Sequence, residues 1–361
     1  MDAKHTAEQA HADLTVSMAS VSLNANLLSP SLPWAVVSTD AYDSVSLALN
    51  GLCHSNDVLL QNGYRVQEPT QEDIDGHAKC ANCGERRRAL DRKTVPGCYH
   101  HKDRPKNNRG KRKIYPCCHQ RRGCVVLDAH KYLPVPEGQA EMWRCSKLTP
   151  AQDGVKTARA AVSMDCEMVE VEGGSSEVAQ VCAVDIVTGE VLVDTFVVPK
   201  KKVTDWRTPW SGMSEKRLRQ MVSAGRTVNG WEEAREELWK YVDENTLMVG
   251  QALKHDLEVM RMVHLRVIDT AIVSREAVGK SCKDSFGLKT LCSDILNRDI
   301  QPAQVGHDCM EDTMATREVV LCWVQNPEKV HEWAENLRLK SEQSRKNKAR
   351  KKEEKRAQRN I

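Results

Sequence analysis

Residues 161–169 decide the fold and read AVSMDCEMV. Apolar residues on both sides of the two acids predict a buried β-strand. Successive side chains of a strand point to opposite faces, so Asp165 and Glu167 share one face. Two neighbouring carboxylates in apolar surroundings repel each other and lose hydration unless a cation neutralises them. The strand therefore predicts a site for a hard divalent cation such as Mg²⁺, and two surface acids on an edge strand are the alternative.

The segments that follow this strand have the pattern of an α/β fold. Two more strands follow directly, joined by the turn Thr188-Gly189, and shorter strands then alternate with helices. We expect strands over residues 177–186, 190–198, 246–249 and 266–269, and helices over 229–243, 253–262, 288–296 and 309–324. Three adjacent strands followed by alternating helices and strands predict a mixed sheet flanked by helices.

Two further segments carry acids and a histidine at positions suited to chemistry. Residues 307–312 read HDCMED and open a helix, with His307 at its start and Asp312 more than a turn inside. A neutral imidazole can take a proton from water, and Asp312 can add a metal ligand. Asp256 lies in the first turn of another helix. Taken singly, His307 fits an ordinary capping or surface histidine, and Asp256 fits complementation of the helix dipole.

Together, the three segments resemble the three motifs of the DEDDh 3′→5′ exonuclease superfamily, whose fold is RNase H-like. Asp165 and Glu167 match the first motif, Asp256 the second, and His307 and Asp312 the third. The chain looks most like the RNA exonuclease branch with the Rex-type and REXO-type enzymes. That likeness rests on residues 164–168 (MDCEM), 209–213 (PWSGM), 252–257 (ALKHDL), 267–271 (VIDTA) and 306–312 (GHDCMED), and it covers roughly residues 158–326.

The resemblance implies a two-metal mechanism with Mg²⁺ or Mn²⁺ that releases nucleoside 5′-monophosphates from RNA 3′ ends. One ion would be held by Asp165, Glu167 and Asp312. The other would bridge Asp165 and the scissile phosphate, with Asp256 assisting through water. His307 would deprotonate the attacking water. A second reading keeps this chemistry but acts on DNA, and a third is a zinc-dependent RNA-binding adaptor with a silent nuclease fold.

Departures from the family pattern are small. Gln251 stands where related sequences often have His, and Cys309 and Thr313 replace a common Ser and Ala. None of these changes removes a ligand. Asp269 is a further acid that we interpret as structural, because the set of four acids is complete without it.

A second cluster lies upstream, where six Cys and several His fall within residues 80–130. This segment has too few apolar residues to fold on its own, and zinc can supply the missing free energy. Eight candidate ligands would suit two tetrahedral zinc sites: Cys80, Cys83, Cys98, His100, Cys117, Cys118, Cys124 and His130. His101 and His119 are competing choices. The segment resembles the zinc-binding region upstream of the nuclease in some Rex-type proteins and also CHORD-type modules, and unmetallated thiols in a disordered linker are the alternative.

Composition and charge divide the chain of 361 residues into parts. Residues 86–122 hold 14 Lys/Arg and 2 Asp/Glu, and residues 338–361 hold 11 Lys/Arg and 3 Asp/Glu, which leaves −17 elsewhere from a net charge of +3. We expect a poorly structured segment 1–66, a basic zinc module 78–132, a linker 133–157 rich in Pro and Gly, an exonuclease domain 158–326 and a basic helical or disordered tail 327–361.

These features also limit the compartment and the partners. No apolar stretch is long enough to span a bilayer and no signal peptide is recognisable, so we expect no membrane association and reduced cysteines. The resemblance implies single-stranded RNA 3′ ends as the partner, with DNA possible. The basic segments could contact phosphates regardless of base sequence, or would be solvated charge runs. Lys346–Arg359 could also act as an import signal, which predicts a nuclear or nucleolar protein.

Overall fold

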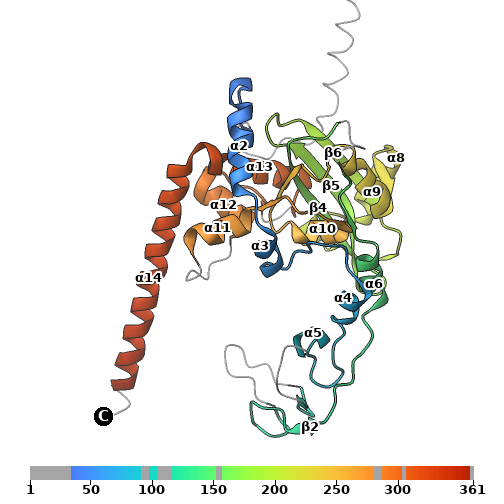
Figure 1. The fold of residues 1–361 in the computed structure, drawn as a ribbon, viewed down its shortest axis with the longest axis vertical. Coiled ribbons are helices and arrows are strands. Elements are labelled where there is room, and N and C mark those ends of the chain that lie inside the picture. The colour runs from blue at the N-terminus through green and yellow to red at the C-terminus, as the bar shows by residue number, and fades with distance from the viewer. Residues whose placement is uncertain are drawn as a thin grey trace, which may run out of the picture. The chain divides into compact units, whose positions relative to one another are not determined.

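The computed structural model describes residues 34–90, 97–104, 115–151, 157–279, 286–302 and 306–357. Within them, one seven-stranded sheet forms the centre, in the order β11-β9-β4-β5-β6-β8 with β7 paired to β4 (Figure 1). The strands are β4 (Ala161–Val171), β5 (Ser176–Asp185), β6 (Val191–Val198), β7 (Val203–Asp205), β8 (Thr227–Asn229), β9 (Leu247–Gly250) and β11 (Val267–Asp269). The three longest strands pair antiparallel, whereas β8, β9 and β11 pair parallel to their neighbours. The expected mixed sheet is confirmed.

Alternate residues of β4 face two helical layers. Val162 and Met164 pack with Leu238 of helix α9 (Gly230–Trp239), whereas Ala161 packs with Val320 of helix α13 (Cys309–Gln325). Ser163, on the Ala161 face, donates its hydroxyl proton to the carbonyl oxygen of Thr313 in α13 at 2.9 Å. Because side chains alternate along a strand, β4 presents its next odd-numbered residues to the α13 side as well.

Five more helices pack within the described part of residues 208–291. They are α7 (Thr208–Ser211), α8 (Glu215–Ser223), α10 (Lys254–Val259), α11 (Thr270–Val278) and α12 (Leu288–Leu291), which continues as a π-helical turn over Cys292–Leu296. None of the helices in the described residues is both long and apolar enough to cross a bilayer.

The expectation that residues 1–66 are poorly structured is wrong for the part that the structure describes, and residues 1–33 lie outside it. Helices α2 (Tyr42–Leu52) and α3 (Asn56–Gln61) cover the exonuclease body. Val45 and Leu49 are buried in the core cluster that includes Val320 of α13. These two residues lie one helical turn apart, a spacing too short to show as a period in the sequence.

The hydroxyl of Tyr64 ties this segment to the sheet. It donates to Asp269 Oδ2 at 2.5 Å in a buried contact, and its pKa is raised well above the usual value by burial and by the Asp269 charge. Because hydrogen bonds to charged groups contribute about 1.5–3 kcal/mol, we expect Tyr64→Phe to lower the unfolding free energy by about 2 kcal/mol. Denaturant unfolding measures this, and an unchanged midpoint would contradict the assigned contact.

The stretch 133–157 is more than a linker, although residues 152–156 lie outside the described residues. Helix α6 (Glu137–Arg144) buries Ala140, Met142 and Trp143, and β3 (Lys147–Leu148) pairs parallel with β10 (Met262–Val263). The prolines lie outside α6, with Pro136 as its N-cap residue, and Gly138 lies in its first turn. A high density of Pro and Gly therefore concealed a short helix.

A buried histidine next to this stretch gives the fold a pH-dependent stability. His264 is 1% exposed, its Nε2 donates to the carbonyl oxygen of Thr246 at 2.8 Å, and the Thr149 hydroxyl contacts Nδ1 at 2.9 Å. Burial lowers the pKa of His264 to about 4. The folded state thus holds neutral imidazole where the unfolded chain, with a pKa near 6.5, binds a proton. The contribution of His264 to the free energy of unfolding is fully present above pH 6.5 and is lost as the pH falls from about 6.5 to 4.

We therefore expect His264→Gln to remove part of the acid sensitivity of the protein. Between pH 7 and 4.5, the wild type should lose about 2 kcal/mol more of unfolding free energy than the variant loses. Urea titrations at the two pH values measure the difference. Equal losses in both proteins would show that His264 does not titrate in this way.

The C-terminal segment forms helix α14 (Pro327–Ala357), which is helical as far as the structure describes it. Its first turns belong to the body, because Val330 and Ala334 are buried. The guanidinium of Arg338 donates to the carbonyl oxygens of Ala277 and Val278 at the end of α11. The tail thus caps a neighbouring helix before it becomes strongly basic.

Candidate active site

The odd-numbered face of β4 and helix α13 bring three predicted residues together. Ligand atoms of Glu167, His307 and Asp312 all lie within 4.8 Å of one another. His307 Nδ1 is 3.3 Å from Asp312 Oδ2, and the side chain of Asp312 is only 5% exposed. The backbone N–H of His307 donates to the carbonyl oxygen of Trp210, at 2.8 Å.

Asp165 and Asp256 complete the cluster from β4 and α10. Asp256 Oδ1 accepts a hydrogen bond from the backbone N–H of Cys166 at 3.1 Å, which holds α10 against the catalytic strand. The Cys309 thiol lies 3.2 Å from the carbonyl oxygen of Asp165 and joins α13 to the same strand. All five residues predicted for the exonuclease site therefore converge in one place, although they come from three separate stretches of the chain.

The electrostatics of these acids show mutual repulsion in a desolvated site. Burial, followed by the charge of Asp312, raises the pKa of Asp165 to about 7. Burial, followed by the charges of Asp165 and Asp312, raises the pKa of Glu167 to about 9. The pKa of Asp256 is also raised, by burial and by Asp165. The hydrogen bond to Asp312 raises the pKa of His307. Such a group of acids is unfavourable unless protons or cations neutralise it.

The PWSGM stretch supports the loop that carries His307. A Cβ at Gly306 would lie 2.8 Å from the carbonyl oxygen of Thr208, and one at Gly212 would lie 2.6 Å from that of His307. Both glycines also have positive φ, 75° for Gly306 and 59° for Gly212. The two loops therefore meet backbone to backbone, which only glycine permits at these positions.

Asp269 is structural, as interpreted from the sequence. Its Oδ1 accepts from the backbone N–H groups of Ala252 and Ala271, and its Oδ2 accepts from Tyr64. Ala252 has φ +55°, a left-handed conformation that needs such support. The turn at Ala252 leads directly into α10, so Asp269 positions the helix that carries Asp256.

Sequence reasoning missed Gln301. Its side-chain amide donates to both carboxylate oxygens of Asp312, at 3.0 and 2.8 Å, and lies 3.5 Å from His307 Nδ1. Gln301 lies in a loop between two helices, where no periodicity marks a residue as functional. The one feature of the sequence that could have pointed to Gln301 was its position six residues before His307.

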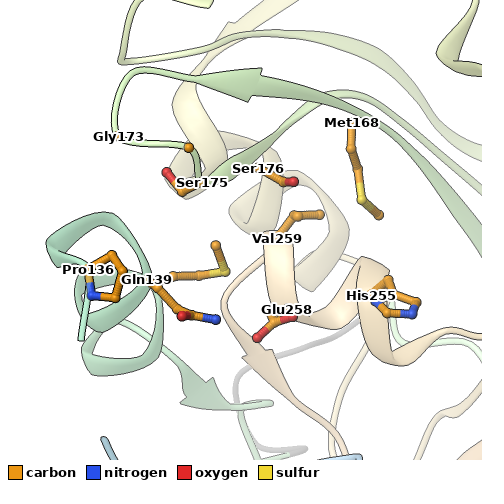
Figure 2. A pocket seen from close by; sticks show the side chains of 11 residues that line it. Pro136, Gln139, Met168, Gly173, Ser175, Ser176, His255, Glu258 and Val259 are labelled. Atoms are coloured by element: carbon orange, nitrogen blue, oxygen red, sulfur yellow. The ribbon is translucent and has the colours of Figure 1, made fainter. Parts of the chain in front are cut away.

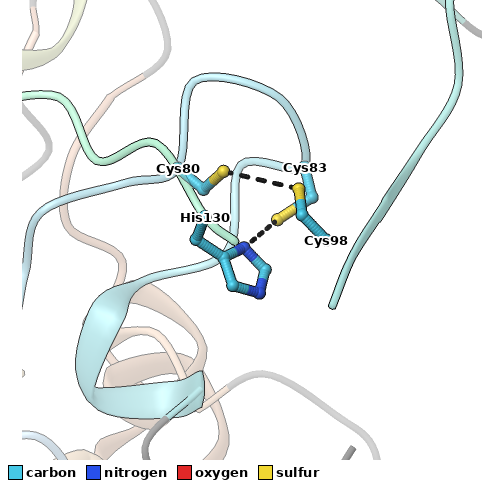
Figure 3. A group of neighbouring side chains, drawn as sticks. All are labelled: Cys80, Cys83, Cys98 and His130. Atoms are coloured by element: carbon cyan, nitrogen blue, oxygen red, sulfur yellow. Dashed lines mark hydrogen bonds between the residues drawn. The ribbon is translucent and has the colours of Figure 1, made fainter. Parts of the chain in front are cut away.

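The cysteines and histidines of the upstream segment form two groups. Cys80, Cys83, Cys98 and His130 make the first, with ligand atoms within 4.8 Å of one another (Figure 3). The Sγ atoms of Cys80 and Cys98 are 3.6 Å apart, and Cys83 Sγ is 3.5 Å from His130 Nδ1. Burial opposes ionisation of Cys80, but hydrogen bonds from the backbone of Cys83 and Asn82 lower the pKa of its thiol to about 6.

The second group contains His101, Cys117, Cys118 and Cys124, again within 4.8 Å. His101 Nδ1 is 3.6 Å from Cys117 Sγ and 3.3 Å from Cys118 Sγ. A hydrogen bond from the backbone of Asp103 lowers the pKa of Cys117 to about 7. A lowered thiol pKa favours the thiolate, which is the form that binds metal.

One predicted ligand needs correction, since His101 replaces His100. The short strand β1 (Cys98–His100) pairs antiparallel with β2 (Val125–Leu127), and its side chains alternate between faces. Cys98 faces the first group, and His101, three positions later, faces the second, where its ring stacks on Tyr115 at 3.5 Å between centroids. His100 Nδ1 is buried and has no hydrogen-bond partner among the described residues.

Comparisons with known proteins indicate the family of the chain. A model of the exonuclease family matches residues 162–320. RNA exonuclease 3 of Eremothecium gossypii is 30% identical over 293 residues, which are 76% of this chain and 72% of that protein. An uncharacterised exonuclease of Schizosaccharomyces pombe is 37% identical over 166 residues, 46% of this chain, and the chain spans only 25% of its length.

Among solved structures, the similarity is limited. The pseudoubiquitin hydrolase-RNA exonuclease module of Saccharomyces cerevisiae Pan2 in complex with AAGGA RNA is similar with a TM-score of 0.44 and 21% identity, over 55% of this chain and 34% of that one. The four candidate acids and His307 lie within the residues 162–320 that the family model matches. On the family match and the similarity to RNA exonuclease 3, the chain belongs to the exonuclease family, in the branch of the RNA exonucleases.

Proposed function

We propose that this exonuclease is a metal-dependent 3′→5′ exoribonuclease that releases nucleoside 5′-monophosphates from single-stranded RNA ends. The convergence of Asp165, Glu167, Asp256 and Asp312 with His307 carries the proposal. We infer RNA and not DNA as the substrate from RNA exonuclease 3 of Eremothecium gossypii, because this chain covers 72% of that protein.

The donor set fits divalent ions such as Mg²⁺ or Mn²⁺. Carboxylate oxygens are the ligands that these hard ions prefer. The pKa values of Asp165 and Glu167 are raised because the site lacks positive charge to neutralise its buried carboxylates. In the proposed arrangement, Asp165, Glu167 and Asp312 hold one ion, and Asp165 and Asp256 serve a second. Bound there, a pair of ions would stabilise the charge that develops on the phosphate oxygens.

The remaining roles are to remove a proton from the attacking water and to orient the side chains that do so. Asp312 accepts from His307 Nδ1, orients the imidazole and strengthens it as a base, which suits His307 to take a proton from the attacking water. Hydrolysis then adds that water to the terminal phosphodiester, and yields a nucleoside 5′-monophosphate and a new 3′-hydroxyl end. Gln301 donates to both oxygens of the Asp312 carboxylate and so fixes its orientation next to His307.

A comparison of labelled substrates tests the direction and the nucleic acid. Wild-type protein with Mg²⁺ or Mn²⁺ should shorten 5′-labelled RNA stepwise and leave a ladder, and should act more slowly on single-stranded and duplex DNA. An RNA with a blocked 3′ end should resist. Release of label from the 5′ end, or faster digestion of DNA than of RNA, would overturn the corresponding part of the proposal.

We further propose that the two Cys/His groups each hold a structural zinc ion, which fits four sulfur and nitrogen ligands in tetrahedral sites. The basic end of α14 is exposed along Arg345–Lys348, which supports nuclear import as its role. Deletion of residues 346–359 from a fluorescent fusion should then shift the protein from the nucleus to the cytoplasm, and unchanged localisation would reject this role.

A further inference from the structure

A groove made of two adjoining cavities lies along α10, the helix that carries Asp256. Its first part is a cavity of about 260 Å³ lined by Met168, His255, Glu258 and the loop Gly173–Ser176. Figure 2 shows His255 and Glu258 on α10, with Gln139 of α6 across the hollow. Met168 directly follows Glu167, and His255 directly precedes Asp256. Helix α10, which carries Asp256, therefore also forms a wall of the groove through His255 and Glu258.

The second part is a cavity of about 610 Å³ that shares Gln139, His255 and Glu258 with the first. Its other wall comes from the segment 60–88, which lies upstream of the family match. Four cations line it: Arg65, Arg86, Arg88 and Lys254. We call the two cavities together the α10 groove.

The two acids in the α10 groove are already occupied by donors. Glu258 Oε1 accepts from Trp143 Nε1 at 2.8 Å and lies 3.4 Å from the guanidinium of Arg65. Asp73 Oδ2 accepts from both the backbone N–H and the hydroxyl of Thr70. Glu258 is thus paired with Arg65, and the four cations of the second cavity outnumber its two acids.

The arginines on the far wall are not neutralised in the same way. Arg86 and Arg88 are exposed, and none of the described acids forms an ion pair with either. Their effect reaches the His77 imidazole, whose pKa is lowered by burial and then by the charges of Arg88, Arg86 and Arg65. The α10 groove therefore carries a positive potential along the wall that the upstream segment builds.

We propose that the α10 groove binds the part of a single-stranded RNA that lies 5′ of the nucleotide being removed, through its phosphates. This inference rests on the proposed function, because a 3′ end held at the acids must send the rest of the strand away from them. A positively charged groove suits a strand that carries one phosphate per nucleotide. The exposed imidazole of His255 stands where the two cavities join and can stack on a base.

The segment 60–88 would thus make the enzyme prefer longer substrates. Arg88→Glu reverses one charge in the groove. Arg87→Glu is the matched control, because Arg87 lies in the same segment but does not line the groove, and its guanidinium lies 6.0 Å from the centre of the Tyr132 ring.

The experiment measures kcat/KM of the full chain on an RNA of about 20 nucleotides and on a trinucleotide, at several salt concentrations. Arg88→Glu should lower kcat/KM about tenfold on the long RNA and much less on the trinucleotide. It should also reduce the slope of log(kcat/KM) against log[salt] by about 0.7 for the lost phosphate contact. Arg87→Glu should have no such length dependence.

Equal losses on both substrates, or equal losses in the two variants, would overturn the inference. Wild-type protein that degrades no RNA from its 3′ end would instead reject the proposed function, so the two failures are distinguishable. Circular dichroism and zinc content confirm that Arg88→Glu is folded. Arg86→Gln, which removes charge without reversing it, provides the second variant and should show the same length dependence more weakly.

Discussion

Asp165→Asn should lower the rate of RNA degradation about a thousandfold or more, because it removes the acid proposed to contact both metal ions. The change preserves the shape of the side chain, so the fold should remain intact. Initial rates on 5′-labelled RNA with Mg²⁺ or Mn²⁺ measure the loss. Glu190→Gln is the control, since Glu190 is an acid whose side chain is 56% exposed and pairs with Arg159 on the same sheet.

Asp165→Asn should raise the stability of the metal-free protein although it lowers activity. Burial and Asp312 raise the pKa of Asp165 to about 7, so without metal the carboxyl favours folding at low pH and loses this contribution as pH rises through 7. At pH 8, metal-free Asp165→Asn should therefore melt at a higher temperature than the wild type. Added Mn²⁺ should raise the melting temperature of the wild type and have little effect on the variant. Undiminished RNA degradation, or an unchanged response to Mn²⁺, would reject the proposed metal site.

Zinc removal should have the second large effect. We expect about two zinc ions per chain, and about one after Cys98→Ser or after Cys117→Ser, because each substitution removes a ligand from a different group. Since few apolar side chains stabilise this segment, loss of zinc should unfold it. Metal analysis gives the stoichiometry, and limited proteolysis within residues 78–132 reports the loss of structure.

Two neighbouring histidines provide the sharpest control. His101→Ala should lose one zinc ion, whereas His100→Ala should retain both, because only His101 lies with the three cysteines of the second group. A purified chain without zinc, or one in which His100→Ala loses the ion and His101→Ala does not, would contradict the ligand assignment.

The catalytic strand was predictable from sequence because its fold and its chemistry are both local. Asp165 and Glu167 alternate within an apolar run, and this period places them on one face whatever the rest of the chain does. Asp256 and Asp312 each lie in the first turn of a helix, and a helix start is marked by its own neighbouring residues. The resemblance to known motifs then joined these stretches.

The missing parts depend on contacts between residues far apart in the chain. Tyr64 and Gln301 act through single hydrogen bonds to Asp269 and Asp312, and no spacing in the sequence reveals such a bond. The choice between His100 and His101 depends on which face of β1 meets which cysteines. That face is set by the pairing of β1 with β2, which the sequence of either strand alone does not fix.

The contact between Tyr64 and Asp269 bears on how the enzyme can be shortened in the laboratory. A recombinant fragment that starts at residue 158 would keep every acid of the family signature. It would nevertheless expose the apolar surface that α2 and α3 cover. It would also remove the Tyr64 hydroxyl that donates to Asp269, the residue that supports the turn before α10. The smallest workable enzyme therefore begins before α2, more than a hundred residues upstream of the first signature acid.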